Sequence, residues 1–540
     1  MKYTPKVHIT PLPMKCDAYT IGGNLFQSEK AKEKSGYYGV FRKALSKIDP
    51  FLYDEGDERM IFIGIQRILH RLFYKPLEQW EISETVSALQ YARATPTGLR
   101  PYWFPKELWQ ICIDKYNGRI PIIIKAMPEG SVVYRNEPTF KVHSLVEDFG
   151  EFAAMFESKL LQVWASSERI TQDMHMYDKI RKKIRKVNPN LSKEEVNFIA
   201  SIMITDFGDR AGMCEQESEE QGLAGLYAFP GTDTFCAGYQ AWKNSNHTPG
   251  VFSSVYALAH RNIQAFDNEN EAYMSLYNAM DNDSFGSMVN DCYSSRNAVE
   301  KYHVPLALQA HRDKNGKIIV TRPDSGIAKD EVLWTVGIAV KNNLFETVII
   351  NGIEWKVGTN LKFIEGDGLT NKDILDIMDA LIELNYVFYA WGLFGQGGGK
   401  RNSLKRDNLS AKFALWSIGN DDQPVVKFSD TFGKTTIPGP CKVLRSKEAL
   451  ESKKTVVFEH EPGEDAMVVY YNGLAEEDFF DGGMLDDFNV IKARMHEQFD
   501  SMPLTMTTEK NHGYSISDKV TEVRRALLNK YAPNKEASDY

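Results

Sequence analysis

Short apolar strands alternate with helical segments across residues 205–400, and this rhythm limits the possible folds more than any other feature of the chain. Ile318–Thr321 predicts a strand that runs into the turn Arg322–Gly326, and Lys329–Lys341 follows as a helix. Leu361–Ile364 predicts a second strand, again followed by apolar residues at the helical period. This β-α-β-α order builds a parallel sheet or a barrel, so we expect an α/β fold.

Turn signals add detail to the same region. Asn351-Gly352 predicts a two-residue hairpin turn, and Asn371 is expected to cap the helix that follows Gly366-Asp367-Gly368. Tyr386–Trp391 predicts a further strand, with Phe394–Gly399 as the turn after it. These Gly- and Asp-bearing turns follow strand C-termini, where parallel sheets and barrels bind ligands.

The regions on either side lack this rhythm. Within residues 1–160, Arg59–Tyr74 and Leu77–Arg93 have helical patterns, whereas Ile120–Tyr134 is strand-like. Phe413–Leu527 predicts short strands and hairpins with a few helical pieces.

Charge and cysteine content exclude several classes of protein. Lys and Arg number 64 against 73 Asp and Glu, and the formal net charge of −9 argues against a general nucleic-acid binder. We interpret the basic run Lys179–Lys186 as a solvated helix face. The longest apolar runs, such as Met60–Ile65, are far shorter than the roughly 18 residues of a membrane helix. The 6 cysteines form no C-x-x-C pair, so we expect reduced thiols in a cytoplasmic protein without a membrane segment.

A run of glycines precedes several basic residues. Gly397–Gly399 is followed by Lys400, Arg401, Lys405 and Arg406. Consecutive glycines let backbone N–H groups approach an anion, and the cations can supply counter-charge, so the composition suits a phosphate. The segment matches neither a Walker loop nor a dinucleotide-binding G-x-G-x-x-G. A glycine-rich turn beside a solvated basic helix fits the same residues equally well.

Two acidic turns and one histidine are further candidates. Arg322 suits a phosphate or an amide, and Asp324 in the same turn suits a ribose hydroxyl or Mg²⁺. Asp367 lies between two glycines, which lets its carboxylate approach a sugar. His260 lacks the spacing of a zinc-binding histidine pair. Each of these features also has a purely structural interpretation, and no G-x-S-x-G sequence supports serine hydrolysis.

Eight segments, taken in order, resemble the type II phosphoribosyltransferases and among them the nicotinamide phosphoribosyltransferases. The match runs over nearly the whole chain, and eight ordered segments are far more specific than any one of them. The segments are Asp17–Tyr19, Asp206–Arg210, Phe229–Asp233, Ala257–His260, Ser287–Asp291, Arg322–Gly326, Gly366–Gly368 and Phe394–Gly399 with Lys405–Asp407.

The resemblance implies a fold, a reaction and an assembly. The fold is an irregular α/β barrel, residues 161–410, with a β-rich α+β domain begun by residues 1–160 and completed by residues 411–540. The reaction transfers phosphoribosyl from phosphoribosyl pyrophosphate to nicotinamide, giving nicotinamide mononucleotide and pyrophosphate. Mg²⁺ is the implied cofactor, ATP is an optional coupling substrate, and a homodimer shares its active sites.

The resemblance also implies roles for single residues. Phe207 stacks on one face of the pyridine ring and Tyr19 of the partner subunit on the other. Arg210, Asp233 and Arg322 bracket the carboxamide. The catalytic set is His260, which accepts phosphate from ATP, with Asp291, Arg322 and Asp324. Ribose, phosphate and metal contacts fall to Asp291 and Asp324 (the Mg²⁺ ligands), Ser287, Gly366, Asp367, Gly397, Gly398, Arg406 and the partner subunit's Arg42.

Some positions depart from the family pattern. Ala259 stands where the family has Glu before the histidine, and Arg261 replaces a small residue after it, which bears on ATP coupling. Downstream of Arg406, only Lys412 remains near the family's phosphate-binding Ser and Lys.

Three alternatives remain open. The nearest is a nicotinate phosphoribosyltransferase, against which Asp233 argues because a second carboxylate would repel nicotinate. Another is a catalytically silent relative that acts as a binding protein, which the intact Asp291, Arg322, Asp324 and Asp367 disfavour. The third is an unrelated phosphate-binding barrel enzyme.

Overall fold

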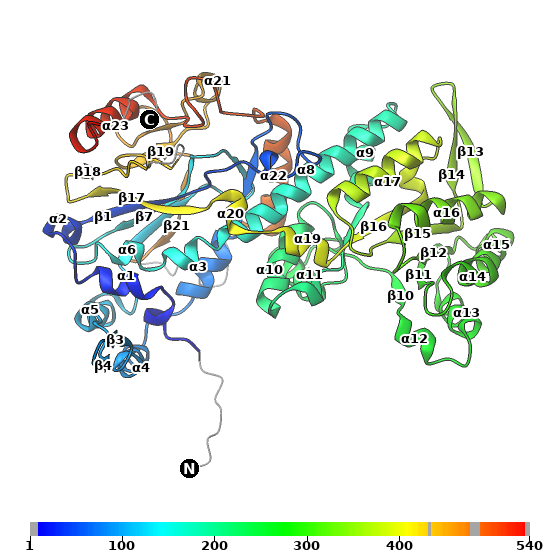
Figure 1. Cartoon of the computed structure of the whole chain (residues 1–540), viewed down its shortest axis with the longest axis horizontal. Helices are drawn as coiled ribbons and strands as arrows, with labels where there is room; N and C mark the ends of the chain where they lie inside the picture. The colour runs from blue at the N-terminus through cyan, green and yellow to red at the C-terminus, as the bar shows by residue number, and fades with distance from the viewer. Residues whose placement is uncertain (1–8, 430–433, 476–485, 535–540) are drawn as a thin grey trace, which may run out of the picture. The chain divides into compact units, whose positions relative to one another are not determined.

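The computed structural model describes residues 9–429, 434–475 and 486–534 (Figure 1). The chain forms two compact units. The first unit comprises Met1–Ile48, Gly56–Glu168 and Arg406–Tyr540, and the second comprises Asp49–Glu55 and Arg169–Lys405. Helix α8 (Val163–Val187) begins in the first unit and continues in the second.

The second unit is built on a seven-stranded sheet in the order β10-β11-β12-β15-β16-β8-β9, with every neighbouring pair parallel. The strand β9 at one edge forms a bridge from Gly231 to Ser253, three residues before the strand β10 at the other edge. Backbone hydrogen bonds of 2.8 and 2.9 Å secure this bridge, so the sheet curls toward a closed barrel. The α/β prediction is confirmed.

The strands of the second unit are β8 (Ile204–Asp206), β9 (Gly231–Thr232), β10 (Tyr256–Leu258), β11 (Phe285–Val289), β12 (Ile318–Arg322), β13 (Phe345–Ile350), β14 (Ile353–Gly358), β15 (Leu361–Glu365) and β16 (Gly392–Gln396). Its helices are α9 (Lys193–Ser201), η3 (Asp209–Ala211), α10 (Glu215–Leu226), α11 (Phe235–Asn244), α12 (His260–Gln264), α13 (Glu269–Ala279), α14 (Ser295–Ala298), η4 (Val299–His303), α15 (Val304–Asp313), α16 (Ala328–Lys341), α17 (Asn371–Glu383), α18 (Phe388–Trp391) and α19 (Gly398–Ser403).

Local signals are confirmed in part of this region. The β13–β14 hairpin turns at Asn351 and Gly352, both with positive φ, as the two-residue turn requires (Figure 1). The cap of α17 is Thr370, whose side chain accepts from the Asp373 amide, and Asn371 is the first helical residue. The predicted cap is therefore wrong by one residue.

The predicted strand Tyr386–Trp391 is wrong. Phe388–Trp391 forms the short helix α18, and the strand is Gly392–Gln396, whose last three residues were predicted to belong to the turn Phe394–Gly399. Its glycines are there for close packing. A Cβ added at Gly392 would lie 2.2 Å from the Phe363 carbonyl oxygen on the neighbouring strand, so no larger residue fits.

The first unit is built on a six-stranded sheet in the order β18-β17-β1-β7-β5-β21, with every neighbouring pair antiparallel. Strands from both ends of the chain lie side by side in it: Tyr38 of β1 pairs with Ala414 of β17, and Ile124 of β5 pairs with Tyr471 of β21. In the predicted helical segment Arg59–Tyr74, the first residues instead form β2, paired with β6, and the helix starts at Ile65.

The strands of the first unit are β1 (Ser35–Val40), β2 (Met60–Phe62), β3 (Arg93–Thr95), β4 (Gly98–Arg100), β5 (Ile122–Ala126), β6 (Ser131–Val133), β7 (Pro138–Ser144), β17 (Lys412–Ile418), β18 (Gln423–Pro424), β19 (Cys441–Val443), β20 (Val456–Phe458) and β21 (Val468–Asn472). Its helices are η1 (Leu12–Met14), α1 (Ala18–Gly23), α2 (Glu29–Glu33), η2 (Leu45–Lys47), α3 (Ile65–Phe73), α4 (Gln79–Leu89), α5 (Lys106–Tyr116), α6 (Phe152–Met155), α7 (Glu157–Leu160), α20 (Arg406–Leu409), α21 (Lys447–Ser452), α22 (Phe488–Ser501) and α23 (Asp518–Tyr531).

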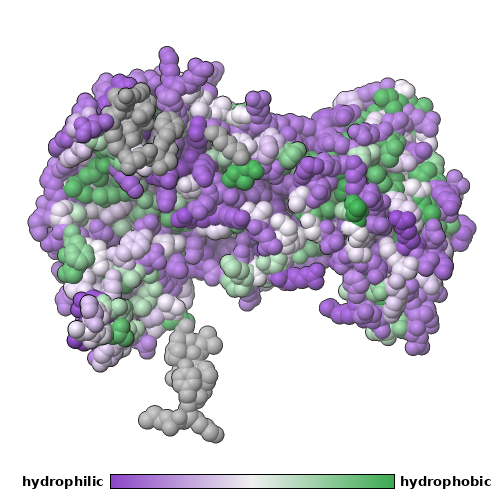
Figure 2. Space-filling view, viewed as in Figure 1, coloured by the Kyte–Doolittle hydropathy of each residue, from purple (hydrophilic) through white to green (hydrophobic). Residues whose placement is uncertain are grey.

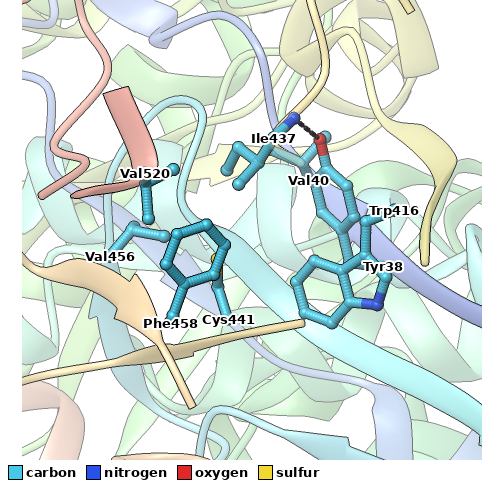
Figure 3. Close-up of a cluster of buried hydrophobic side chains, with 8 residues drawn as sticks. All are labelled: Tyr38, Val40, Trp416, Ile437, Cys441, Val456, Phe458 and Val520. Atoms are coloured by element: carbon cyan, nitrogen blue, oxygen red, sulfur yellow. Dashed lines mark hydrogen bonds between the residues drawn. The ribbon is translucent and has the colours of Figure 1, made fainter. Parts of the chain in front are cut away.

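A buried cluster joins the two chain ends within the first unit (Figure 3). The rings of Tyr38 and Trp416 stack with centroids 4.9 Å apart, and the Tyr38 hydroxyl accepts the Ile437 amide at 2.8 Å. Val456 and Val520 add aliphatic contacts from the C-terminal segments. Burial of each such side chain contributes roughly 1.5–3 kcal/mol, so the C-terminal part of the chain is integral to this unit.

Hydropathy and ion pairs describe part of the surface. The face in Figure 2 is covered mainly by hydrophilic residues, and no helix within the described residues is long and apolar enough to span a bilayer. The basic run on α8 is ion-paired: Lys179 lies 2.7 Å from Asp54, and Arg181 lies 2.7 Å from Asp178. Lys183 pairs with Asp379.

Candidate active site

The parallel sheet brings most of the predicted site residues to one edge. Strands that run parallel all end at the same edge, so the loops after them share it. In chain order the sheet places there Phe207 after β8, Asp233 after β9, His260 after β10, Asp291 after β11, Arg322 and Asp324 at the end of β12, Gly366 and Asp367 after β15, and Gly397 and Gly398 after β16. Ser287 lies within β11 itself and is buried.

Contacts link four of these loops. His260 Nε2 lies 2.8 Å from Asp291 Oδ1, and His260 Nδ1 lies 3.9 Å from Asp324 Oδ2. Arg322 Nη2 donates to Asp324 Oδ1 at 3.1 Å. The Arg322 guanidinium carbon is 5.5 Å from the centroid of the Phe207 ring. The structure therefore joins the predicted catalytic set to the predicted stacking residue.

Two glycines form the seat of the Phe207 ring. A Cβ added at Gly395 would lie 2.2 Å from Cε2 of this ring, and one at Gly366 would lie 3.1 Å from it. The Phe207 amide donates to the Gln396 carbonyl at 2.8 Å. The two close glycines and the backbone hydrogen bond together fix the position of the ring at the sheet edge.

Two of the predicted carboxamide-binding residues, Asp233 and Arg210, differ in their side-chain contacts. Asp233 is exposed, and its Oδ1 accepts a hydrogen bond from Ser254 Oγ at 2.6 Å. Arg210 lies exposed in η3, and its side chain makes no hydrogen bond or ion pair within the described residues. The sequence did not single out Ser254, although a hydroxyl so close before β10 was a usable signal.

Glu365 is a second functional candidate that the sequence did not single out. It is buried at the end of β15, and its Oε1 accepts the Asp367 amide at 3.1 Å. Burial raises the pKa of Glu365 to about 7, with smaller contributions in the same direction from Asp367 and Asp324. Its Oε2 has no hydrogen-bond partner among the described residues. This carboxyl supports the turn that carries the exposed Asp367.

The basic residues after the glycine run correct our expectation. Lys400 and Arg401 are buried, and they point to carboxylates of the second unit: Lys400 Nζ lies 2.9 Å from Asp173 Oδ1, and Arg401 Nη2 lies 3.3 Å from Asp206 Oδ2. They cannot serve as free counter-charge for a bound phosphate. A Cβ added at Gly399 would lie 3.1 Å from the Gly368 carbonyl oxygen, so the loops after β15 and β16 pack against each other.

The remaining predicted residues belong to the first unit. Tyr19 on α1 is exposed, and its hydroxyl donates to Glu157 Oε2 at 3.1 Å. Desolvation, reinforced by Glu157, raises the pKa of Tyr19 to about 12. Arg42 follows β1, and its amide donates to the Leu409 carbonyl at 3.0 Å, beside the helix that begins at Arg406.

Arg42 and Arg406 form one basic cluster with Lys412. The pKa of Lys412 is lowered, first by burial and then by the charges of Arg406 and Arg42. Arg406 itself lies next to Asp407, with Nε 3.1 Å from Oδ1. All three residues belong to the first unit, and the charges of both arginines act on the same lysine.

The carboxylates at the sheet edge suit Mg²⁺ only in part. No group of three or more His, Cys, Asp or Glu side chains in the described part of the chain could hold a metal by itself. Asp291 and Asp324 lie on either side of His260 and offer hard oxygen ligands. Mg²⁺ is commonly held by one or two carboxylates together with substrate phosphates, so the two residues fit a metal that arrives with pyrophosphate.

Comparison with known proteins identifies the family. The model of the nicotinate phosphoribosyltransferase (NAPRTase) family matches residues 202–471. A nicotinamide phosphoribosyltransferase of Xanthomonas campestris pv. campestris (strain 8004) is 25% identical over 453 residues, which cover 81% of this chain and 90% of that protein.

Two solved structures share the fold. Human nicotinic acid phosphoribosyltransferase aligns with a TM-score of 0.54 at 13% identity, covering 96% of this chain and 99% of that one. Nicotinate-nucleotide pyrophosphorylase from Pyrococcus furiosus aligns with a TM-score of 0.51 at 14% identity, covering 93% and 98%.

Proposed function

This chain belongs to the nicotinate phosphoribosyltransferase (NAPRTase) family, and we propose that it transfers phosphoribosyl from phosphoribosyl pyrophosphate to nicotinamide. The products are nicotinamide mononucleotide and pyrophosphate. Members of this family are phosphoribosyltransferases of NAD salvage that act on a pyridine base. The choice of nicotinamide as that base rests mainly on Asp233.

The surroundings of Asp233 favour an amide over a carboxylate. The Ser254 hydroxyl donates to Oδ1 at 2.6 Å, which leaves Oδ2 as an acceptor. The amide N–H₂ of nicotinamide can donate to that oxygen, whereas nicotinate offers only acceptors and a negative charge. Phe207 provides the aromatic surface for the ring of either base.

The residues at the sheet edge suit the chemistry of phosphoribosyl transfer. Loss of pyrophosphate leaves positive charge near C1 of the ribose, which Asp324 and Asp367 can stabilise. Arg322, held by Asp324 at 3.1 Å, brings a cation for developing negative charge. The pyridine nitrogen attacks with its own lone pair, so the site needs no strong general base. Mg²⁺ held by Asp291 and Asp324 would neutralise charge on the leaving pyrophosphate.

We assign His260 to ATP coupling. Asp291 holds Nε2 at 2.8 Å and so fixes the ring, while Nδ1 remains the nitrogen that can accept a phosphoryl group. His260→Ala is expected to retain basal transfer and to lose stimulation by ATP. Equal ATP stimulation of the wild type and the variant would remove His260 from this role.

The proposal includes a homodimer with shared sites. Tyr19 and the basic cluster of Arg42, Arg406 and Lys412 belong to the first unit, and Phe207 belongs to the second. In the proposed assembly, the first unit of one subunit completes the site of its partner.

Nicotinate is the second candidate for the base. Arg210 favours it, because its exposed guanidinium has no partner within the described residues and could pair with a carboxylate. The family also includes nicotinate enzymes by name.

A direct assay decides between the two bases. The protein is incubated with phosphoribosyl pyrophosphate, Mg²⁺ and either base, with and without ATP, and each mononucleotide is measured by chromatography. We expect nicotinamide mononucleotide as the favoured product. A higher kcat/KM for nicotinate would support the second candidate, and no product from either base with folded protein would refute the enzyme proposal.

A further inference from the structure

A buried carboxylate connects the two predicted base-binding residues. Asp206 is the last residue of β8 and directly precedes Phe207. Its backbone oxygen accepts the Asp233 amide at 2.9 Å, and its Oδ2 accepts the Thr234 hydroxyl at 2.6 Å. Asp206 therefore contacts the loop that carries Asp233 twice, while the chain continues into Phe207.

Within the described residues, the Thr234 hydroxyl makes this hydrogen bond and no other. Thr234 is the N-cap of α11, where a threonine oxygen usually accepts an amide from the first turn. Here the side chain makes no capping hydrogen bond, and it donates to Asp206 instead. Thr234 and Asp206 are both buried. The N-terminus of α11 therefore lacks a capping hydrogen bond from Thr234, whose hydroxyl instead links the helix to β8.

Two arginines hold the Asp206 carboxylate from other elements. Arg169 Nη1 of α8 lies 3.4 Å from Oδ1, and Arg401 Nη2 of α19 lies 3.3 Å from Oδ2. Arg401 also donates to the Ser218 carbonyl at 3.4 Å. A Cβ added at Gly208 would lie 2.2 Å from Arg401 Nε, so the guanidinium also packs against the residue after Phe207.

We propose that Asp206 is a positioning residue for base recognition: through Thr234 and Arg401 it fixes Asp233 and Phe207 relative to each other. The inference rests on the proposed function, because it assumes that these two residues contact the pyridine base. Asp206 is buried, so it would act on the base through these neighbours. Two arginines balance its charge and hold the carboxylate in one position. The loops that carry Asp233 and Phe207 are bonded to Asp206 and are therefore held in place with it.

Thr234 allows the link to be cut while both ion pairs of Asp206 are kept. Thr234→Val removes the hydroxyl at nearly constant volume and leaves Asp206 with both arginines, whereas Thr234→Ser keeps the hydroxyl. Thr85→Val is a matched control, since Thr85 is also buried and its hydroxyl donates to the Glu81 carbonyl at 2.7 Å in the first unit. Thermal unfolding reports the stability of all three variants.

The kinetic readout separates positioning from general stability. For Thr234→Val we expect KM for nicotinamide to rise about three- to tenfold and the preference for nicotinamide over nicotinate to narrow. KM for phosphoribosyl pyrophosphate should stay within about twofold of the wild type. Thr234→Ser and Thr85→Val should keep the wild-type KM for nicotinamide.

The outcomes distinguish this inference from the proposed function. An active wild type with equal KM values for nicotinamide in Thr234→Val and Thr234→Ser would overturn the inference alone. A rise in both substrate KM values in Thr234→Val would also overturn it, because the defect would then be general. A wild type that neither binds a pyridine base by calorimetry nor forms a mononucleotide would overturn both.

Discussion

The parallel sheet of the second unit and the antiparallel sheet of the first differ in how they gather binding residues. In the second unit, β11 and β12 are neighbours in the sheet and close in the sequence, and each contributes a loop to the same edge. In the first unit, Ser35 pairs with Ile418, so strands from opposite ends of the chain must meet before Arg42 and Arg406 can form one cluster.

The two units also differ in how firmly their predicted site residues are held by contacts within the same unit. The residues of the second unit hold one another, as the Asp291–His260–Asp324 contacts demonstrate. Tyr19 in the first unit is exposed, and within the described residues its hydroxyl bonds only to Glu157. A ligand can thus find a preformed set in the second unit, whereas the first unit presents an aromatic ring and a basic cluster on its surface.

The largest effect is expected from removal of one stacking ring in each region. Tyr19→Ala and Phe207→Ala should each lower kcat/KM by about 10- to 100-fold, since stacking of a base on an aromatic side chain contributes roughly 1–3 kcal/mol. If sites are shared, mixing the two variants under subunit exchange should restore about a quarter of wild-type activity. Half of the dimers are then hybrids, and each hybrid has one intact site.

A second mixture tests whether the first unit acts as a block. Tyr19→Ala mixed with Arg42→Ala should regain nothing, because both changes lie in the first unit and every hybrid site receives one of them. Recovery in this control, or no recovery in the Tyr19 and Phe207 mixture, would contradict the division of labour between the two units.

A smaller effect is expected from the buried carboxyl under the Asp367 turn. Glu365 has its pKa raised from 4.5 to about 7, so the unfolded chain loses this proton at lower pH than the folded protein does. Between those pH values the folded state binds more protons, and the free energy of unfolding falls as pH rises. The total loss is at most about 3 kcal/mol. Glu365→Gln cannot ionise and should lack this part of the pH dependence.

Denaturant unfolding at a series of pH values measures this difference. The variant should gain stability relative to the wild type from pH 5 to pH 7, and the gain should level off above that range. Glu195→Gln is a suitable control for a carboxyl outside the site, because Glu195 is an exposed residue of the α9 capping box. Parallel pH profiles of Glu365→Gln and the wild type would show that Glu365 is ionised in the folded protein.

The parallel sheet was predictable because its signals are local. Strand length, helical period and the Asn351-Gly352 turn each depend on neighbouring residues, and the edge that collects the site follows from the parallel order. The error at Tyr386–Trp391 arose because the glycines of Phe394–Gly399 were taken as turn signals, although Phe394–Gln396 belong to β16. Those glycines are required by side chains from elsewhere, as the Phe207 ring against Gly395 demonstrates.

The partners of buried charges were not predictable in the same way. Lys400 and Arg401 follow the glycine run in the sequence, but their carboxylate partners Asp173 and Asp206 come from distant elements. Ser254 and Glu365 likewise become candidates for the site only through their hydrogen bonds to Asp233 and Asp367. The hydrophobic periodicity of the sequence does not predict such contacts, because they depend on tertiary packing.

The smallest effect is expected at Asp233. Asp233→Ser removes the charge that repels nicotinate and the acceptor for the nicotinamide amide, so the ratio of kcat/KM for the two bases should narrow. Asp233 is exposed, and two unit charges 4 Å apart in water interact by only about 1 kcal/mol. We therefore expect a change of roughly five- to tenfold from the charge in this solvated setting, and each further loss of solvent in the assembled site would enlarge it.

Asp233→Asn separates charge from shape. The amide keeps the size of the side chain and an oxygen that can accept from Ser254, so a role in the turn alone predicts wild-type selectivity for Asn and lost stability for Ser. A role in selectivity predicts that both variants narrow the ratio, because both lack the charge. Measured in folded variants with both bases, an unchanged ratio in each would leave Asp233 as a residue of the turn. Arg210, another exposed ionic group of the loops, is then the candidate for base selection, and its removal should in that case lower the use of nicotinate selectively.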